Sequence, residues 1–471
     1  MDAPSPPPET DEEVVDALVA RARAAMDAWR NDDQAVVDDA VTALAWAIYK
    51  PENARMLAEM AVRDSGLGNV ESKITKNTRK TFGTLRDLLR ARSVGIIEEL
   101  PERGLVRYGK PVGVVAAVCP STNPAATPVN KSMMALKGGN AVIIAPSPAG
   151  FSTCREVVKL MRGELERIGA PPDLVQMLPA VSFTLTGALM DRVDLAVVTG
   201  SQDNVKRAMR SGTVAIGVGP GNVPVIVDSS ANLDDAAAKV AASKTFDNAT
   251  SCSSENALVI LDDVYEDAIA ALERQGAYRC SPEEVELVRA TLWKDGALNR
   301  DVIAKDANVL AEVAGLPEAA RDARFFLAEQ DEVDGPHGFA DEKLSLVLTV
   351  YRARDFDEAK RLCREVLEVR GKGHSVGIHT ADMDHARELA AETDVIRVLV
   401  NQAHTFGNGG GFDNALPFTL SMGGGTWAGN TLGDNLNWRC FVNVTQLVTT
   451  IPEDRPTEEA LFGAFWERHG R

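Results

Sequence analysis

The sequence predicts an α/β protein with a mainly parallel sheet, and three observations lead to this fold class. Short apolar runs alternate along the chain with longer segments in which apolar residues recur at helical spacing. Glycine- or proline-rich turns close several of these runs, as is typical where strands of a parallel sheet end. The chain has 471 residues, 45% of them apolar and 25% charged, which is enough to build a substantial core.

The first part of the chain is expected to be helical, after an acidic, proline-rich tail at residues 1–10 that we expect to be disordered. Within residues 11–93 the apolar spacing predicts helices over Glu12–Trp29, Asp32–Tyr49 and Pro51–Ser65. Lys73–Arg92 is basic and amphipathic, and we interpret it as the solvated face of a helix, not as a ligand site.

Residues 110–228 then alternate between strands and helices. Helices are expected at Ala125–Leu136 and Ser152–Ile168, and strands at Pro111–Pro120, Ala141–Ala145, Leu174–Leu178, Leu195–Thr199, Val214–Val218 and Val223–Val227. Such βαβ units form parallel sheets. We therefore expect residues 110–228 and the helices of residues 11–93 to make a Rossmann-type nucleotide-binding domain.

The pattern begins again after Asp228 and predicts a second α/β domain over residues 229–430. Its helices are expected at Asp234–Phe246, Tyr265–Arg274, Pro282–Leu292, Phe356–Val369 and Met383–Glu392, and its strands at Ala257–Leu261, Leu346–Val350, Ser375–His379 and Arg397–Val400. A hairpin at residues 94–109 and a strand within residues 431–450 lack local partners. We expect them to pair with each other, in this chain or in another, ahead of a C-terminal tail at residues 451–471.

Composition excludes several classes of partner. The formal charge is -18, from 68 acidic and 50 basic residues, which argues against a nucleic acid or a membrane surface. The six cysteines include no CxxC pair, so we expect reduced thiols and a cytoplasmic location. No apolar run reaches the ~18 residues that a membrane span needs. Metal-binding motifs are also missing, and we expect no metal.

Cys252 is the principal candidate for chemistry. It lies among small polar residues just before the apolar run Ala257–Leu261, where a substrate carbon has room to approach. A buried, inert cysteine is an equally good interpretation of the spacing alone. Asn123 follows a strand at a proline-rich turn, where its amide can donate to an oxyanion or can simply form the turn.

Three further segments allow both functional and structural interpretations. Thr199-Gly200-Ser201 leads a strand into a helix, where backbone N–H groups either hold a phosphate or form a plain cap. The glycines of Gly217–Gly221 permit a close backbone approach or a tight turn. His374 and His404 are each a general acid or base, or a hydrogen-bonded structural residue, with the weaker functional case for His404.

Taken together, these segments resemble the aldehyde dehydrogenase superfamily from about Asp11 to Thr449, and within it the coenzyme A-dependent acylating branch. The motifs that carry the resemblance, in order, are Ser121–Pro124, Ile144–Pro148, Val198–Ser201, Gly217–Pro224, Ser243–Cys252, Glu342–Leu346, Gly373–His374 and Gly423–Asn430. The resemblance implies the superfamily's fold, with a nucleotide-binding domain, a catalytic domain at residues 229–430 and a β arm for oligomerisation. It further implies a homodimer or homotetramer.

Residue roles follow from the same resemblance. Cys252 is expected to be the nucleophile, Asn123 to stabilise the oxyanion, and His374 to assist acyl transfer. Glu342 is expected to bind the nicotinamide ribose of NAD or NADP. The remaining residues expected to bind the cofactor are Ser121, Thr122, Ala145, Pro146, Ser147, Thr199, Gly200, Ser201, Gly217, Val218 and Gly219.

Two departures from the hydrolytic relatives indicate the branch. The stretch Gly217–Gly219 lacks the glutamate that activates water, so the thioester is expected to pass to coenzyme A. Ala145 replaces a lysine, which leaves NAD and NADP both open. The residues around Cys252 are most similar to members that act on sulfoacetaldehyde, with Thr250, Ser251 and Arg439 as candidates for its sulfonate. Alternatives are acetaldehyde or another short aldehyde, a hydrolytic reaction, or an inactive protein of this fold.

Overall fold

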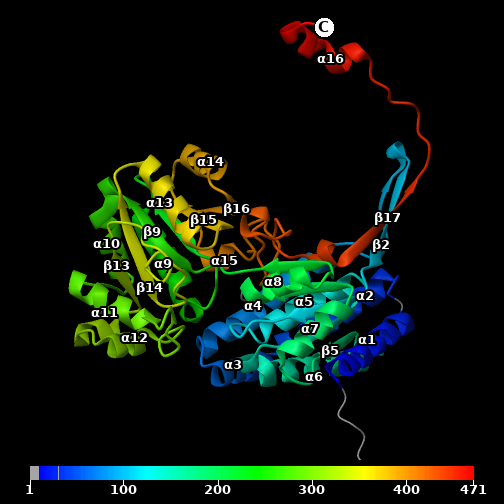
Figure 1. Cartoon of the computed structure of the whole chain (residues 1–471), viewed down its shortest axis with the longest axis horizontal. Coiled ribbons are helices and arrows are strands. Elements are labelled where there is room, and N and C mark those ends of the chain that lie inside the picture. Colours follow the sequence, from blue (N-terminus) through cyan, green and yellow to red (C-terminus); the bar gives the residue numbers. More distant parts are fainter. Residues whose placement is uncertain (1–9, 30, 201) are drawn as a thin grey trace, which may run out of the picture.

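The computed structural model describes residues 10–29, 31–200 and 202–471, so all but Thr10 of the predicted disordered tail lies outside the described residues (Figure 1). The α-helices are α1 (Asp11–Ala28), α2 (Gln34–Tyr49), α3 (Pro51–Ser65), α4 (Val70–Leu89), α5 (Ala126–Lys137), α6 (Phe151–Arg167), α7 (Phe183–Arg192), α8 (Gln202–Arg210), α9 (Leu233–Thr245), α10 (Tyr265–Arg274), α11 (Pro282–Leu292), α12 (Ala307–Ala314), α13 (Phe356–Val369), α14 (Met383–Glu392), α15 (His404–Gly407) and α16 (Glu458–His469). The strands are β1 (Gly95–Leu100), β2 (Leu105–Pro111), β3 (Val114–Val118), β4 (Ala141–Ala145), β5 (Val175–Met177), β6 (Leu195–Thr199), β7 (Ala215–Val218), β8 (Val223–Val227), β9 (Glu255–Leu261), β10 (Ala277–Arg279), β11 (Trp293–Lys294), β12 (Ala297–Leu298), β13 (Phe325–Glu329), β14 (Val347–Ala353), β15 (Gly373–His379), β16 (Val395–Val400) and β17 (Val442–Val448).

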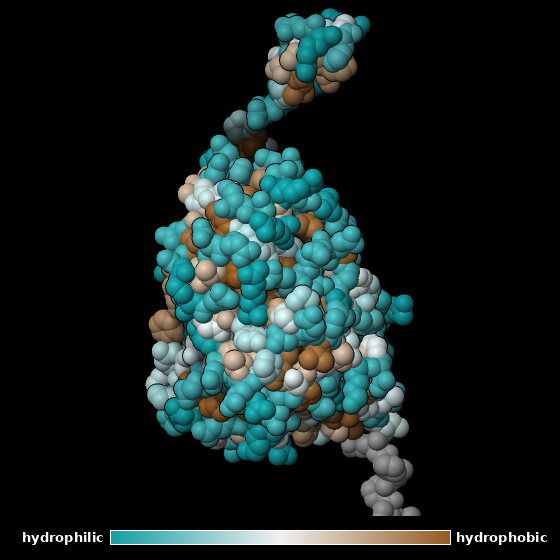
Figure 2. All heavy atoms as spheres, turned by 90° about the vertical axis from the view of Figure 1, so that its left-hand side faces the viewer, coloured by the Kyte–Doolittle hydropathy of each residue, from teal (hydrophilic) through white to brown (hydrophobic). Residues whose placement is uncertain are grey.

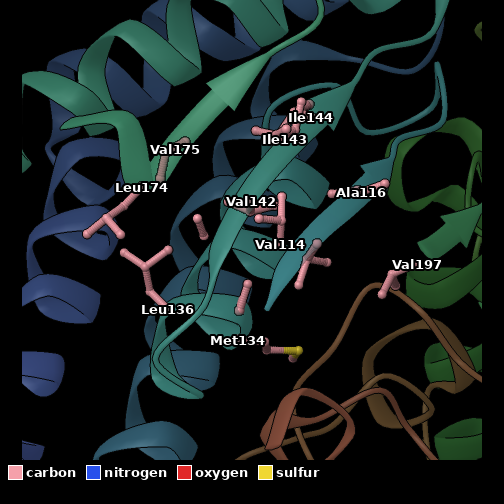
Figure 3. Packing of buried hydrophobic residues seen from close by; sticks show 14 of the residues in the cluster. Val114, Ala116, Met134, Leu136, Val142, Ile143, Ile144, Leu174, Val175 and Val197 are labelled. Atoms are coloured by element: carbon pink, nitrogen blue, oxygen red, sulfur yellow. The ribbon is translucent and has the colours of Figure 1, made fainter. Parts of the chain in front are cut away.

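A five-stranded parallel sheet forms the first layer, in the order β5-β4-β3-β6-β7. Every residue of β3 and β4 is buried because helices pack on the sheet, among them α1, α5, α6 and α8. Aliphatic side chains of β3, β4 and the neighbouring helix α5 interdigitate there (Figure 3). The chain leaves β3 for β4 on one side and returns to β6 on the other, which places a ligand-binding crevice at the carboxyl ends of these strands.

A seven-stranded parallel sheet, β10-β13-β14-β9-β8-β15-β16, forms the second layer. The prediction placed Val223–Val227 with the first sheet, and this was wrong: β8 pairs with β9 and β15. The reason is the short link Gly219–Asn222, since a crossover between parallel strands of one sheet needs roughly a dozen residues. The chain therefore passes directly from the end of β7 into the other sheet.

The arm is a three-stranded antiparallel sheet, β1-β2-β17, that projects from the body (Figure 1). The strand predicted within residues 431–450 pairs with the hairpin of its own chain, and its register runs from Val442 opposite Pro111 to Val448 opposite Leu105. Beyond it, α16 stands clear of the body with apolar atoms at its surface (Figure 2). Leu461, Phe462 and Phe465 are 63%, 48% and 53% exposed.

Among the helices that the structure describes, none combines the length and the apolar character that crossing a bilayer would require.

Truncating the core of the first sheet is expected to destabilise the protein. Ile143 lies in β4 and is fully buried, so Ile143→Ala leaves a cavity and should lower the free energy of unfolding by about 2–5 kcal/mol. Urea unfolding followed by tryptophan fluorescence measures the change. Ile96→Ala in β1 is the matched control, because that side chain is already 37% exposed. Equal losses for both variants would contradict the assignment of the core.

Candidate active site

One cavity of about 920 Å³ is lined by residues from both α/β parts of the chain. Turns at the carboxyl ends of β3, β4 and β6 line one side, and Cys252, three residues before β9, lines the other. The predicted site residues that line it are Ser121, Thr122, Asn123, Ala145, Pro146, Ser147, Thr199, Gly200, Gly219, Cys252 and Glu342. The fold therefore brings most of the predicted site together from segments far apart in sequence.

Three predicted residues are placed differently, and a fourth cannot be compared. Gly217 and Val218 lie within β7 and do not line the cavity; a Cβ on Gly217 would meet Val205 Cγ1 at 2.4 Å, so this glycine allows α8 to pack on the strand. His374 lines a smaller adjoining cavity of about 240 Å³. Ser201 lies outside the described residues.

The turn that precedes Cys252 has an unusual backbone. Asp247, Asn248 and Ala249 have φ values of 51°, 53° and 60°, three consecutive non-glycine residues in the left-handed region. Each such residue costs roughly 1–3 kcal/mol, so the turn persists only because its surroundings fix it. Asn248 Nδ2 donates to Asp306 Oδ1 at 2.8 Å, which anchors the turn from the second layer.

Asp247 anchors the same turn to helix α4. Its carboxylate accepts hydrogen bonds from Lys76 Nζ at 2.5 Å, Lys73 Nζ at 3.0 Å and Thr250 Oγ1 at 2.7 Å. Burial alone would raise the pKa of Asp247, but the two ammonium groups hold it below its usual value. The interpretation of Lys73–Arg92 as a solvated face was therefore wrong: Lys73 and Lys76 are 3% and 5% exposed because they pair with a buried carboxylate.

The Cys252 side chain is partly exposed to the cavity and enclosed by protein elsewhere. Burial raises the pKa of its thiol to about 12, and the charge of Glu342 adds to this shift. A hydrogen bond from Ser253 and the charges of Arg397 and Lys76 act in the opposite direction. Without a bound ligand the sulfur is consequently a thiol, with positive groups positioned to favour its thiolate.

His374 approaches Cys252 through Gly221. A Cβ on Gly221 would come within 2.2 Å of Cys252 O and 2.9 Å of His374 Nε2, so only glycine lets the two segments meet. His374 Nδ1 is 2.8 Å from Ser375 Oγ, which is 2.9 Å from His404 Nε2, while His374 Nε2 has no partner among the described atoms. Burial lowers the pKa of His374 well below its usual value, so the imidazole is neutral.

Arg397 supports this histidine from β16 and was not predicted. Its guanidinium is 4% exposed and donates to His374 O at 2.8 Å and Gly423 O at 2.6 Å. Burial lowers the pKa of Arg397 to about 10, and a Cys252 thiolate would raise it. The sequence does contain a signal for Arg397, because it is the single charged residue in the otherwise apolar strand Val395–Val400. A charged side chain is rarely buried in a strand unless it has a partner or a function.

Glu342 is the carboxyl group that acts most strongly on Cys252. Burial raises its pKa to about 8, although Arg370 and the backbone N–H of Gly221 oppose the shift. It is therefore mostly protonated at neutral pH. Elsewhere in the described part of the chain, histidine, cysteine and acidic side chains form no group of three suited to a metal ion.

The comparisons with known proteins agree with this geometry. Residues 6–278 match the aldehyde dehydrogenase family. The chain is 50% identical over 470 residues to a sulfoacetaldehyde dehydrogenase (acylating) of Cupriavidus necator, covering 99% of this chain and 95% of that protein. An acetylating aldehyde dehydrogenase structure from Geobacillus thermoglucosidasius superposes with a TM-score of 0.90 at 34% identity, covering 95% and 98% of the two chains. A Rhodopseudomonas palustris propionaldehyde dehydrogenase structure with bound CoA and an acylated cysteine has a TM-score of 0.82 at 25% identity, covering 94% and 98%.

The high thiol pKa predicts how Cys252 reacts in the ligand-free enzyme. Because the thiolate fraction grows about tenfold per pH unit below the pKa, alkylation of Cys252 by iodoacetamide should accelerate steadily from pH 7 to pH 10 without a plateau. Peptide mass spectrometry at each pH gives the rate at this residue, and Cys252→Ala identifies its peptide. A plateau below pH 8 would show that the free thiol is already activated.

Proposed function

Because the chain belongs to the aldehyde dehydrogenase family, we propose that it catalyses the acylating oxidation of a short aldehyde to a coenzyme A thioester, with NAD or NADP as the acceptor. The aldehyde is sulfoacetaldehyde and the product sulfoacetyl-CoA, in a reversible reaction. One observation carries the proposal: Cys252 opens into a dinucleotide-sized cavity, while the stretch Gly217–Gly219 that leads toward it has no carboxylate.

The reaction assigns a role to each group around Cys252. The thiolate attacks the aldehyde carbon, and the Asn123 amide and the Cys252 backbone N–H donate to the oxyanion of the thiohemiacetal. A bound nicotinamide would supply the acceptor for the hydride that the thiohemiacetal carbon loses, and Cys252 would then carry a thioester. The thiol of coenzyme A would then give its proton to the neutral, unpartnered Nε2 of His374 and attack the thioester carbon. The bond from that carbon to the Cys252 sulfur breaks as the acyl-CoA forms, and the proton on His374 returns to the Cys252 thiolate.

The turns of the first sheet provide the proposed cofactor site. Thr199 and Gly200 would contact the pyrophosphate, and Ala145 and Pro146 the adenosine side. Ser147 Oγ supports this, since it is buried on the cavity wall with no hydrogen-bond partner among the atoms described. Glu342 would accept hydrogen bonds from the nicotinamide ribose.

Hydrolysis is the second candidate function, and Glu342 is the observation that raises it. A carboxylate near the thioester is the group that hydrolytic relatives use to activate water. Because burial raises the pKa of Glu342 to about 8, the group is mostly a carboxylic acid at pH 7, and only its minor carboxylate fraction can accept a proton from water. The charge state of this residue therefore favours acyl transfer to a thiol.

The proposed function is tested by the coenzyme A dependence of turnover. Formation of NADH or NADPH from sulfoacetaldehyde should need coenzyme A, and Cys252→Ala should lower kcat by roughly four or more orders of magnitude. Cys440→Ala is the matched control, since Cys440 is also partly exposed but lies outside the cavity. Rates that are equal with and without coenzyme A would establish hydrolysis instead, and full activity of Cys252→Ala would exclude both functions.

We also propose that the arm joins copies of this chain into a homodimer or homotetramer. Val444, Leu447 and Val448 of β17 are 49%, 50% and 68% exposed, and an apolar patch of this kind is typical of a surface that a second subunit covers.

We also propose a cytoplasmic location, because the six cysteines are all free thiols.

A charge on the arm is expected to disrupt this assembly. Val448→Asp should lower the molar mass measured by light scattering, because the carboxylate would lose its hydration at the interface. Val313→Asp on α12 is the control, as that valine is 50% exposed away from the arm. An unchanged mass for Val448→Asp would place the contact between subunits elsewhere.

A further inference from the structure

Helix α4 gives one wall of the catalytic cavity an excess of positive charge. Lys76, Arg79 and Lys80 all line the cavity. Asp247 is the carboxylate that pairs with this wall, and it is already shared between Lys76 and Lys73. Two basic side chains, Arg79 and Lys80, therefore face the cavity without forming an ion pair among the described residues.

Arg79 is held in place by aromatic rings. Its guanidinium carbon lies 5.5 Å, 5.5 Å and 5.3 Å from the ring centroids of Phe406, Phe412 and Phe418. Its Nη1 is buried and has no hydrogen-bond partner in the described structure, and Asp413 acts on it only through a longer-range charge interaction. A buried donor of this kind costs free energy unless a ligand accepts from it.

Lys80 is the second basic side chain of this wall, and it lines the same cavity as Cys252. Its Nζ donates to Gly409 O at 2.6 Å, and burial, followed by the charges of Arg79 and Lys76, lowers its pKa to about 7. A thiolate at Cys252 would raise the pKa of Lys80. Lys76 links the wall to the residues just before Cys252, because it donates to Thr250 Oγ1 at 2.8 Å.

The residues first considered for a sulfonate fit less well. The Thr250 hydroxyl donates to Asp247 and accepts from Lys76, which leaves it no free donor. Arg439 lies in a separate groove beside the arm, with its guanidinium 4.9 Å from the Trp438 ring. Ser251 lines the cavity, but a neutral hydroxyl cannot balance a sulfonate charge.

We propose that Arg79, assisted by Lys80, forms an anion subsite that binds the sulfonate of the aldehyde substrate while the carbonyl carbon lies at Cys252. The inference rests on the proposed function. A planar guanidinium can donate two parallel N–H groups to two sulfonate oxygens, and the surrounding rings fix its plane. The sulfonate would in turn balance the charge of Arg79 and Lys80, which line the cavity and form no ion pair among the described residues.

The test compares a charged with an uncharged aldehyde. Arg79→Gln should lower the ratio of kcat/KM for sulfoacetaldehyde to kcat/KM for propionaldehyde by roughly 10- to 100-fold, as expected for loss of hydrogen bonds to a charged group. Arg79→Lys should recover part of the ratio, because it restores the charge without the bidentate geometry.

Arg86→Gln is the matched control. Arg86 lies on the same helix, 5.2 Å and 4.9 Å from the rings of Phe412 and Phe418, but it pairs with Asp87 and lines the separate groove. The Arg86→Gln variant should keep the wild-type ratio of kcat/KM for sulfoacetaldehyde to kcat/KM for propionaldehyde. Ethanesulfonate, an unreactive anion, should compete with propionaldehyde in the wild type and at least tenfold more weakly in Arg79→Gln.

The outcomes separate the subsite from the proposed function. If the wild type needs coenzyme A and Cys252 but Arg79→Gln keeps the wild-type ratio, the subsite is overturned and the function stands. A raised KM for coenzyme A with an unchanged ratio would assign Arg79 to the coenzyme A phosphates and also overturn it. No coenzyme A-dependent turnover by the wild type would overturn the proposed function itself.

Discussion

The buried carboxylate of Asp247 is the constraint on which the site depends. It lies between two ammonium groups of α4 and a hydroxyl of the turn that it belongs to. Three consecutive left-handed residues are unfavourable by themselves, so the turn keeps this shape only because its contacts, these ion pairs among them, hold it in place. Gly68 belongs to the same arrangement, because a Cβ there would come within 1.8 Å of Asp247 Oδ1. The position of Cys252 is set by these contacts.

Burial keeps the catalytic side chains in their uncharged forms when no substrate is bound. The thiol of Cys252 and the carboxyl of Glu342 both have raised pKa values, and the imidazole of His374 has a lowered one, so each is neutral at pH 7. The charges of Lys76 and Arg397 act on Cys252, and Arg397 also donates to His374 O. A site with neutral reacting groups and fixed positive neighbours stabilises negative charge when it forms on sulfur or on the carbonyl oxygen.

Much of the fold followed from the sequence because apolar periodicity reports burial directly. The helices before Gly66 and most strands around the cavity lie where the pattern predicted, and the family comparisons support the fold class. The sheet assignment of β8 failed because periodicity identifies a strand but not its neighbours. The site residues on α4 were missed for a related reason. A basic helix has the same pattern whether solvent or a buried Asp247 balances its charges.

The contact between α4 and the turn before Cys252 also limits how the molecule can move. Helix α4 packs with α2, α3 and α5 of the first layer, whereas the turn leads into β9 at the centre of the second. A hinge that swung the two layers apart would pull Lys73 and Lys76 away from a carboxylate with no other counter-ion, and such separations are costly in a buried setting. Parting of the two layers is therefore an unfavourable way to admit substrates to the cavity between them or to release products from it.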